Sequence, residues 1–203
     1  GVDAGVLYAD VLAHILELRS EYTPPILTIG SIHDHTAEGC CNPPIGRRLQ
    51  QGDLIINEIS AIRGAQTTQV SQPILLGSVP ETWQDIIALQ REVYEAGWSM
   101  IKPGTTFGAL CDLVNGLGGE HGIETALQLA GCGYGDDGPL YSAETRSDRT
   151  RDLAMAAGNV FTFQPIAMAR DRKTQFSWGG PVLVTGIGCE PLFKREHGMV
   201  EIN

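Results

Sequence analysis

The stretch AGNVFTFQP, residues 157–165, decides how the fold and the site of this chain are interpreted. Small residues predict a turn, and the alternating run after it predicts a strand that ends in Gln164 and Pro165. A neutral amide can donate and accept hydrogen bonds, but it binds divalent metals weakly and transfers no proton near neutral pH. Whether the protein is a catalyst therefore depends largely on Gln164 and on a few residues like it.

Apolar spacing predicts further elements on both sides of this stretch. Strands are predicted at 26–30, 52–61 and 179–186, with 65–77 as a polar hairpin partner of 52–61. Helices are predicted at 4–20, at 80–101, and from Thr105 or Thr106 through Leu117 to an end at Gly118 and Gly119. This order is typical of an α+β fold. Two similar halves, each with a helix before a hairpin, are conceivable, but the pattern does not align them residue by residue.

Composition limits the class of protein. The chain has 203 residues, which favours one domain over 1–203, and 14 basic against 24 acidic residues give a net charge of -10. Basic residues do not cluster with aromatic ones, so neither nucleic acid nor a membrane is an expected partner. We expect a cytoplasmic protein, because no segment resembles a signal peptide or a membrane span and the five cysteines suit reduced thiols. The chain starts at Gly1, close to a helix, and we expect it to be part of a longer protein.

Two stretches carry weaker signals. The loop expected at 31–46 contains His33 and His35 in HDH and the pair Cys40 and Cys41, which suit a metal or redox site only if partners lie nearby. No partners follow at helical or finger spacing, so a polar surface or pocket loop is the favoured interpretation. The glycine-rich stretch 129–141 lacks the Lys and Ser/Thr of a P-loop, and phosphate binding is not expected.

Several stretches together resemble the creatinase, prolidase and methionine aminopeptidase family. LQQGDLIINEISA resembles its strand opening in Gly-Asp, and MIKPGTTFGAL resembles its helix junction. AGNVFTFQP and PVLVTGIGCEPL are similar to its late and closing strands. The resemblance implies the α+β pita-bread fold, a curved antiparallel sheet covered by helices. It also implies a homodimer and an upstream domain, which often comes from the partner subunit and helps to close the active site.

The resemblance also indicates where the family's metal ligands fall in this sequence. Its two aspartates fall at Glu58 and about Gln69, its Gly-His-Gly histidine at Cys132, its late glutamate at Gln164, its last acidic pair at Gly179 and Gly180, and its accessory histidine near Cys41. Only Glu58 keeps a carboxylate. Two divalent cations bound close together need bridging carboxylates to offset their repulsion. We therefore expect no metal and no other cofactor at this location.

Three hypotheses about function follow from these replacements. The first is a metal-independent, creatinase-like hydrolase that cleaves a C–N bond in a small amidino, imino-acid or amide compound. In that hypothesis Glu58 binds a cationic substrate or acts as a base, Cys132 is a nucleophile, and His33 or His35 supplies an imidazole. The substrate-binding candidates are Gln69, Asp136, Asp137, Gln164 and Trp178.

The second hypothesis is a non-catalytic module that binds a peptide or protein, since loss of catalysis permits the replacement of charged ligands. The third is an Xaa-Pro-type metallopeptidase whose ligands have moved to His33, His35, Asp136 and Asp137. Plainer interpretations stay open for single residues. Glu58 could face solvent, Cys132 could be an inert buried residue, Asp136 and Asp137 could be turn residues, and Trp178 could cover a core edge.

Overall fold

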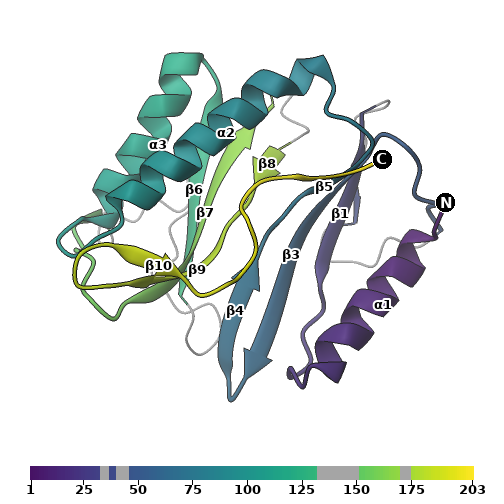
Figure 1. The fold of residues 1–203 in the computed structure, drawn as a ribbon, viewed down its shortest axis with the longest axis horizontal. Helices are drawn as coiled ribbons and strands as arrows, with labels where there is room; N and C mark the ends of the chain where they lie inside the picture. Colours follow the sequence, from purple (N-terminus) through teal and green to yellow (C-terminus); the bar gives the residue numbers. More distant parts are fainter. Residues whose placement is uncertain (33–36, 40–45, 132–150, 170–174) are drawn as a thin grey trace.

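The computed structural model describes residues 1–32, 37–39, 46–131, 151–169 and 175–203. Its helices are α1 (Ala4–Glu17), α2 (Glu81–Met100) and α3 (Phe107–His121). Its strands are β1 (Ile26–Ser31), β2 (Ala37–Gly39), β3 (Asp53–Arg63), β4 (Gln66–Val70), β5 (Ile74–Leu76), β6 (Glu124–Gly131), β7 (Val160–Met168), β8 (Gln175–Ser177), β9 (Gly180–Val184), β10 (Cys189–Pro191) and β11 (Val200–Ile202). The α+β expectation is confirmed (Figure 1).

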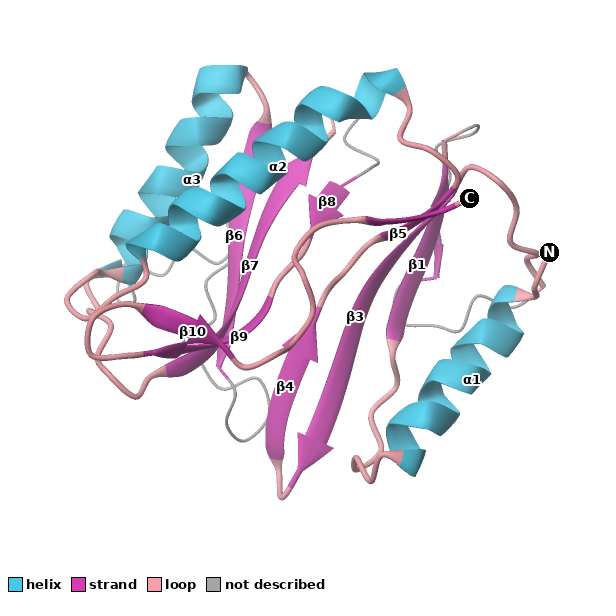
Figure 2. Cartoon of the chain, in the orientation of Figure 1, coloured by secondary structure: helices cyan, strands magenta, loops and turns pink. Residues whose placement is uncertain are grey.

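Two sheets form the body of the molecule. The first has the order β11-β5-β3-β1-β2 with β4 on β3, and the second has the order β10-β9-β7-β6 with β8 on β7. Their pairs are antiparallel except for the parallel pair of β11 and β5. Reciprocal backbone hydrogen bonds between Ser71 and Gly179, of 2.9 and 3.1 Å, join the two sheets. Figure 2 shows the strands of both sheets running across the molecule between the helices.

Helices cover the two sheets unequally. Figure 1 shows α2 and α3 side by side over β6 and β7, whereas α1 lies beside β1 and β3. The main core gathers around α2 and α3, where Trp83 packs edge-on against Phe176 with ring centroids 5.2 Å apart. A smaller core lies under α1 and contains Ala4, Leu27 and Ile55. Burial of apolar area drives both cores, but the second is much the smaller.

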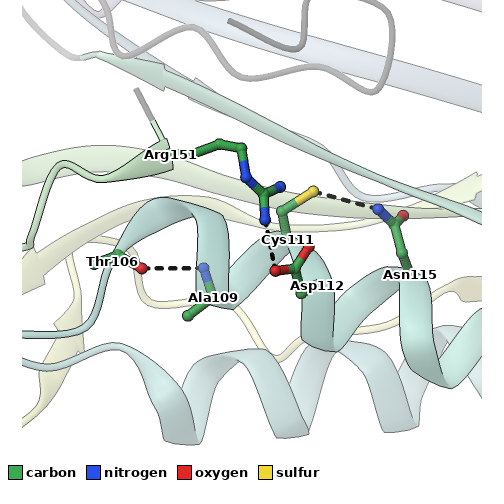
Figure 3. Close-up of polar contacts among 6 residues, drawn as sticks. All are labelled: Thr106, Ala109, Cys111, Asp112, Asn115 and Arg151. Atoms are coloured by element: carbon green, nitrogen blue, oxygen red, sulfur yellow. Dashed lines mark hydrogen bonds and ion pairs between the residues drawn. The ribbon is translucent and has the colours of Figure 1, made fainter. Parts of the chain in front are cut away.

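The start of α3 shows how local chemistry fixes a helix. The Thr106 hydroxyl accepts a hydrogen bond from the backbone N–H of Ala109 at 3.1 Å, which caps the first turn (Figure 3). In the same view, Arg151 lies 2.6 Å from the carboxylate of Asp112, so the segment ahead of β7 is tied to α3. The expectation of a helix that starts after Thr105 or Thr106 is confirmed.

The two halves repeat one arrangement of the chain. We call α1 with β1 to β5 the first half, and α2 and α3 with β6 to β10 the second half. Gly52 before β3 and Gly158 before β7 both have φ of 90°, and each is followed by a residue with a side-chain oxygen. Asp53 accepts from Gln50 N at 3.0 Å, and Asn159 accepts from Ala156 N at 2.8 Å. The strands β3 and β7 are therefore structural equivalents, and Glu58 on β3 corresponds to Gln164 on β7.

Some expectations about elements were wrong. The third predicted helix does not stop at Gly118 and Gly119 but runs to His121 and ends at Gly122, whose φ of 63° suits glycine. Gly118 lies inside the helix, and its lack of a side chain lets Thr125 and Ile123 pack closely against it. The stretch 65–77 pairs with β3 as expected but divides into two strands, β4 and β5. The expected loop 31–46 contains β2. The strand β6 was not expected at all.

Candidate functional site

Three side chains from three strands meet on one side of the joined sheets. The Glu58 carboxylate on β3 accepts a hydrogen bond from Gln69 Nε2 on β4 at 3.0 Å and another from Gln164 Nε2 on β7 at 3.2 Å. We call Glu58, Gln69 and Gln164 the carboxylate–amide cluster. It joins residues that lie 106 positions apart in the chain, at the meeting of the two halves.

Strand alternation explains why these residues share one side. On β3, Ile55 belongs to the small core under α1, whereas Leu54 belongs to the main core, so successive residues face opposite sides. Glu58 lies on the side of Leu54 and is half-buried. The pairing of β3 with β4 places Ser60 opposite Gln69, which brings the Gln69 side chain onto the same side as Glu58. Glu58 therefore does not simply face solvent, because it is half-buried and hydrogen-bonded to Gln69 and Gln164.

Gln164 and its neighbourhood hold unpaired polar atoms. Gln164 is 1% exposed, and its Oε1 has no hydrogen-bond partner among the residues described. The hydroxyl of Ser177, also 1% exposed, likewise has no hydrogen-bond partner among the residues described. Ser177 pairs with Ile166, two positions beyond Gln164 on β7, so strand alternation puts both on one side of the sheet. Sequence reasoning missed Ser177, although its position two residues before Gly179 would have indicated this side.

Gly179 and Gly180 leave no room for the acidic pair that the resemblance places there. A Cβ atom at Gly179 would lie 2.0 Å from the backbone oxygen of Phe163. A Cβ atom at Gly180 would lie 2.8 Å from the ring of Phe193. Real Cβ atoms do not approach other atoms this closely, so a side chain at Gly179 would require a backbone shift, whereas one at Gly180 would require the half-buried Phe193 ring to move.

Trp178 lies in the main core at 2% exposure, and it also lines a cavity of about 280 Å³ beside α2. In that cavity the Tyr94 hydroxyl lies 3.1 Å from His197 Nε2. Burial lowers the pKa of His197 and raises the pKa of Tyr94, with Cys189 adding to the latter. Burial also raises the pKa of Cys189 to about 11, so its thiol stays protonated at neutral pH and is a poor nucleophile.

Five of the predicted site residues lie outside the residues that the structure describes. They are His33, His35, Cys132, Asp136 and Asp137. The same holds for Cys41, the position nearest to the family's accessory histidine. Their roles stay predictions.

The described donor set does not fit two divalent cations. In the part of the chain that the structure describes, no three His, Cys, Asp or Glu side chains gather as a metal site would require. The single carboxylate of the cluster already faces the N–H groups of two amides, and N–H groups repel a cation. Gly179 could not regain a carboxylate without a backbone shift, and Gly180 could do so only if the Phe193 ring moved.

Two joined antiparallel sheets, a helix pair on one of them and polar side chains at their junction define a pita-bread α+β protein. The chain belongs to metallopeptidase family M24, because the model of that family matches residues 6–194. The resemblance proposed from the sequence is therefore confirmed at the level of the family and the fold.

Individual relatives agree with this assignment. Methionine aminopeptidase 1 of Dictyostelium discoideum is 23% identical over 178 residues, which is 78% of this chain and 48% of the relative. Methionine aminopeptidase 1A of Arabidopsis thaliana is 25% identical over 175 residues, 77% of this chain and 44% of the relative. The chain thus spans about half the length of these curated relatives.

Solved structures show the same fold. The X-Pro aminopeptidase from Thermotoga maritima superimposes with a TM-score of 0.80 at 17% identity, covering 100% of this chain and 56% of that one. The methionine aminopeptidase from Rickettsia prowazekii superimposes with a TM-score of 0.75 at 16% identity, covering 93% of this chain and 85% of that one.

None of the helices in the described ranges has both the length and the hydropathy that crossing a membrane requires.

Proposed function

We propose that this M24 protein is a metal-independent, creatinase-like hydrolase that cleaves a C–N bond in a small amidino, imino-acid or amide compound. The observation that carries the proposal is the Glu58 carboxylate held between Gln69 and Gln164 at the junction of the two halves. Amide N–H groups offset the negative charge of Glu58 there, as cations would in a metal site. A cluster of carboxylates without cations would instead be costly, because like charges repel and burial disfavours them.

The polar atoms of the site favour a ligand with N–H donors. Glu58 supplies one negative charge, and Gln164 Oε1 is a buried acceptor with no partner among the described residues. The Ser177 hydroxyl can donate or accept beside it. An amidinium, an imino acid or a carboxamide would satisfy these groups, and a cation would be attracted to Glu58 as well.

The chemical step needs groups from both parts of the chain. Glu58 would anchor the substrate or act as a base, and Cys132 would attack as a nucleophile. His33 or His35 would supply the imidazole, while Asp136 and Asp137 would add negative charge for a cationic substrate. Each of these roles is a hypothesis that mutation can test.

The test combines ligand binding, turnover and metal content. Thermal shift against guanidino compounds, proline-containing dipeptides and cyclic amidines should yield a stabilising ligand, and its product should be sought by mass spectrometry. Glu58→Gln and Cys132→Ser should then each reduce turnover by at least about tenfold. Full turnover in both variants contradicts these catalytic assignments. Two equivalents of bound Mn, Co or Zn in protein purified without chelator contradict metal independence and favour the relocated-ligand metallopeptidase.

A non-catalytic peptide-binding or protein-binding module is the second candidate. The observation that favours it is that both oxygens of Glu58 already accept hydrogen bonds from amides, which leaves the carboxylate less available as a base. This candidate predicts that a ligand stabilises the protein without being converted. It also predicts that Cys132→Ser binds that ligand as tightly as the unmodified chain does.

We further propose a homodimer in the cytoplasm, with a small molecule or short peptide as its ligand. The support for the dimer is the family assignment, and the test is sedimentation velocity over a range of protein concentrations. A mass that stays monomeric at micromolar concentrations contradicts it.

A further inference from the structure

The cavity of about 280 Å³ beside α2 plays no part in the proposed function. Its lining comes from three separate parts of the chain, namely helix α2, Trp178 between β8 and β9, and His197 between β10 and β11. None of the three residues of the carboxylate–amide cluster lines it. The cavity is large enough for a small molecule, and the side chains around it indicate which kind.

Trp178 shows that the cavity and the carboxylate–amide cluster lie on opposite sides of the second sheet. Phe176 of β8 packs against Trp83 of α2, so residue 176 faces the helices. Successive residues of a strand face opposite sides. Trp178 therefore also faces the helices, where it belongs to the main core, whereas Ser177 faces the cluster. A ligand that contacts Trp178 would thus lie in the cavity and not beside Gln164.

Aromatic rings form one wall of the cavity. Tyr94 stacks on Trp98 with ring centroids 5.9 Å apart, and the His197 ring lies 4.3 Å from Tyr94 and 5.5 Å from Trp98. The three pairs of ring planes are tilted by 23°, 41° and 49°, so the wall is curved. Trp178 adds a fourth ring. The faces of such rings are electron-rich and attract cations, and the indole of Trp does so most strongly.

The imidazole of His197 does not oppose a cation at this wall. Its Nε2 atom lies 3.1 Å from the Tyr94 hydroxyl, which holds the ring in place. Burial lowers the pKa of His197, so the ring is neutral at pH 7.

Two side chains of opposite charge stand where the cavity opens to solvent. Arg91 and Glu95 both line the cavity, both are exposed, and they lie four positions apart on α2. Residues with this spacing share one face of a helix, with Cβ atoms about 6 Å apart. Neither forms an ion pair within the part of the chain that the structure describes. Both charges are therefore available to a ligand.

We propose that this cavity binds a small zwitterion that carries a methylated ammonium group and a carboxylate. The ammonium group would lie against the aromatic wall near Glu95, and the carboxylate would lie near Arg91. Methylation favours this position, because ring faces accept hydrogen bonds poorly and a primary ammonium group would lose its partners in water. Binding there would not require turnover at the carboxylate–amide cluster.

The experiment uses glycine betaine, in which one methylene group joins a trimethylammonium group to a carboxylate. Two probes isolate its charges: 3,3-dimethylbutanoate has carbon in place of the ammonium nitrogen, and choline lacks the carboxylate. Titration should change the tryptophan fluorescence, since Trp98 and Trp178 line the cavity, and calorimetry should give the affinities. Glycine betaine should bind at least about tenfold more tightly than either probe.

Three variants test the positions of the two charges. Glu95→Gln should weaken the binding of glycine betaine by about fivefold without weakening that of 3,3-dimethylbutanoate, because only a cation is attracted to residue 95. Arg91→Gln should also weaken glycine betaine by about fivefold, but it should tighten choline, because a like charge is removed. Glu92→Gln is the matched control, since Glu92 is an acidic residue of the same helix that lies 3.5 Å from His121 and does not line the cavity.

Three results would overturn the proposal. The first is the lack of saturable binding of glycine betaine. The second is equal affinity for glycine betaine and either probe, because the cavity would then recognise only one end of the ligand. The third is equal weakening by Glu95→Gln and Glu92→Gln, since the ligand would then respond to the charge of the whole helix and not to the cavity.

Discussion

The two halves of the molecule share a backbone frame and differ in what they place on it. Equivalent turns precede β3 and β7, and the strands then bring Glu58 and Gln164 to equivalent positions at the junction. One half contributes a carboxylate there and the other an amide. The amide donates a hydrogen bond to the carboxylate, and the pair carries one negative charge. Two glutamates at these equivalent positions would carry two charges that repel each other, and two glutamines would carry none.

The same comparison holds deeper in the fold. Asp53 is fully buried and lies 2.7 Å from Arg47, whereas its equivalent Asn159 is exposed and neutral. Both side chains accept the same backbone hydrogen bond, so the turn needs an oxygen atom but no charge. The charge of Asp53 therefore serves its contact with Arg47 and not the turn itself. Four predictions test which properties the two halves share and which belong to one half.

The largest effect is expected at the contact between the halves. Gly179→Ala should lower the free energy of unfolding by about 4 kcal/mol, since a Cβ would meet the Phe163 backbone oxygen and push the segment that bridges to Ser71 away from β7. Ser71→Ala, on the other side of the same bridge, should cost about 1 kcal/mol through loss of its hydrogen bond to Ser177 O. Urea unfolding of both variants measures the difference. Gly116→Ala is the control, because a Cβ there meets nothing within 4 Å.

The next effect is expected from exchanging the equivalent acceptors. Asp53→Asn should cost about 3 kcal/mol, because it leaves the Arg47 guanidinium beside a neutral amide in a buried position. Asn159→Asp should change stability by less than about 0.5 kcal/mol, since residue 159 is exposed. Equal costs in the two variants, measured by urea unfolding, would show that charge matters equally in both turns.

A smaller effect is expected from making the junction symmetric in charge. Gln164→Glu should cost about 2 kcal/mol at pH 7, because two carboxylates would face each other where an amide now donates to one. The loss should shrink as the pH is lowered toward 4, since protonation of either carboxyl removes the repulsion. Gln66→Glu, on the exposed start of β4, should show neither behaviour. A pH-independent loss in Gln164→Glu would contradict the charge argument.

The sequence supported the fold well where turns and strands have strong local signals. The strands around Asp53 and Gln164 were predicted because a glycine turn precedes each apolar run. β6 was missed, although Leu127 and Leu129 alternate with polar residues, because the glycine-rich segment after it dominated the pattern. The repeat was conceivable but could not be aligned, since its halves agree in hydrogen bonds and φ angles more than in side chains.

The candidate site was less accessible to sequence reasoning. Gln164 stood out locally as the amide at a strand end, but Glu58 and Gln69 were grouped with it only through the family resemblance, because no local pattern shows that β3 and β7 meet. Their contact depends on the bridge between Ser71 and Gly179, which is a tertiary feature. Ser177 carries no motif and becomes visible only through the pairing of β8 with β7.

The smallest effect concerns how α2 is held in its half, where His197 from the C-terminal segment meets Tyr94. Burial lowers the pKa of His197 in the folded protein below its ordinary value of 6.5. The unfolded chain therefore binds a proton at His197 more readily, and stability should fall as the pH drops from about 6.5 through the lower folded pKa. Melting temperatures at pH 7.5, 6.5 and 5.5 should show this fall, and His197→Gln should make it shallower. His14→Gln, at a side chain 71% exposed on α1, should leave the slope unchanged. If His197→Gln and His14→Gln gave the same slope of melting temperature against pH, the contact of α2 with the C-terminal segment would not be sensitive to protonation. The difference between α1 and α2 would then lie in their packing alone.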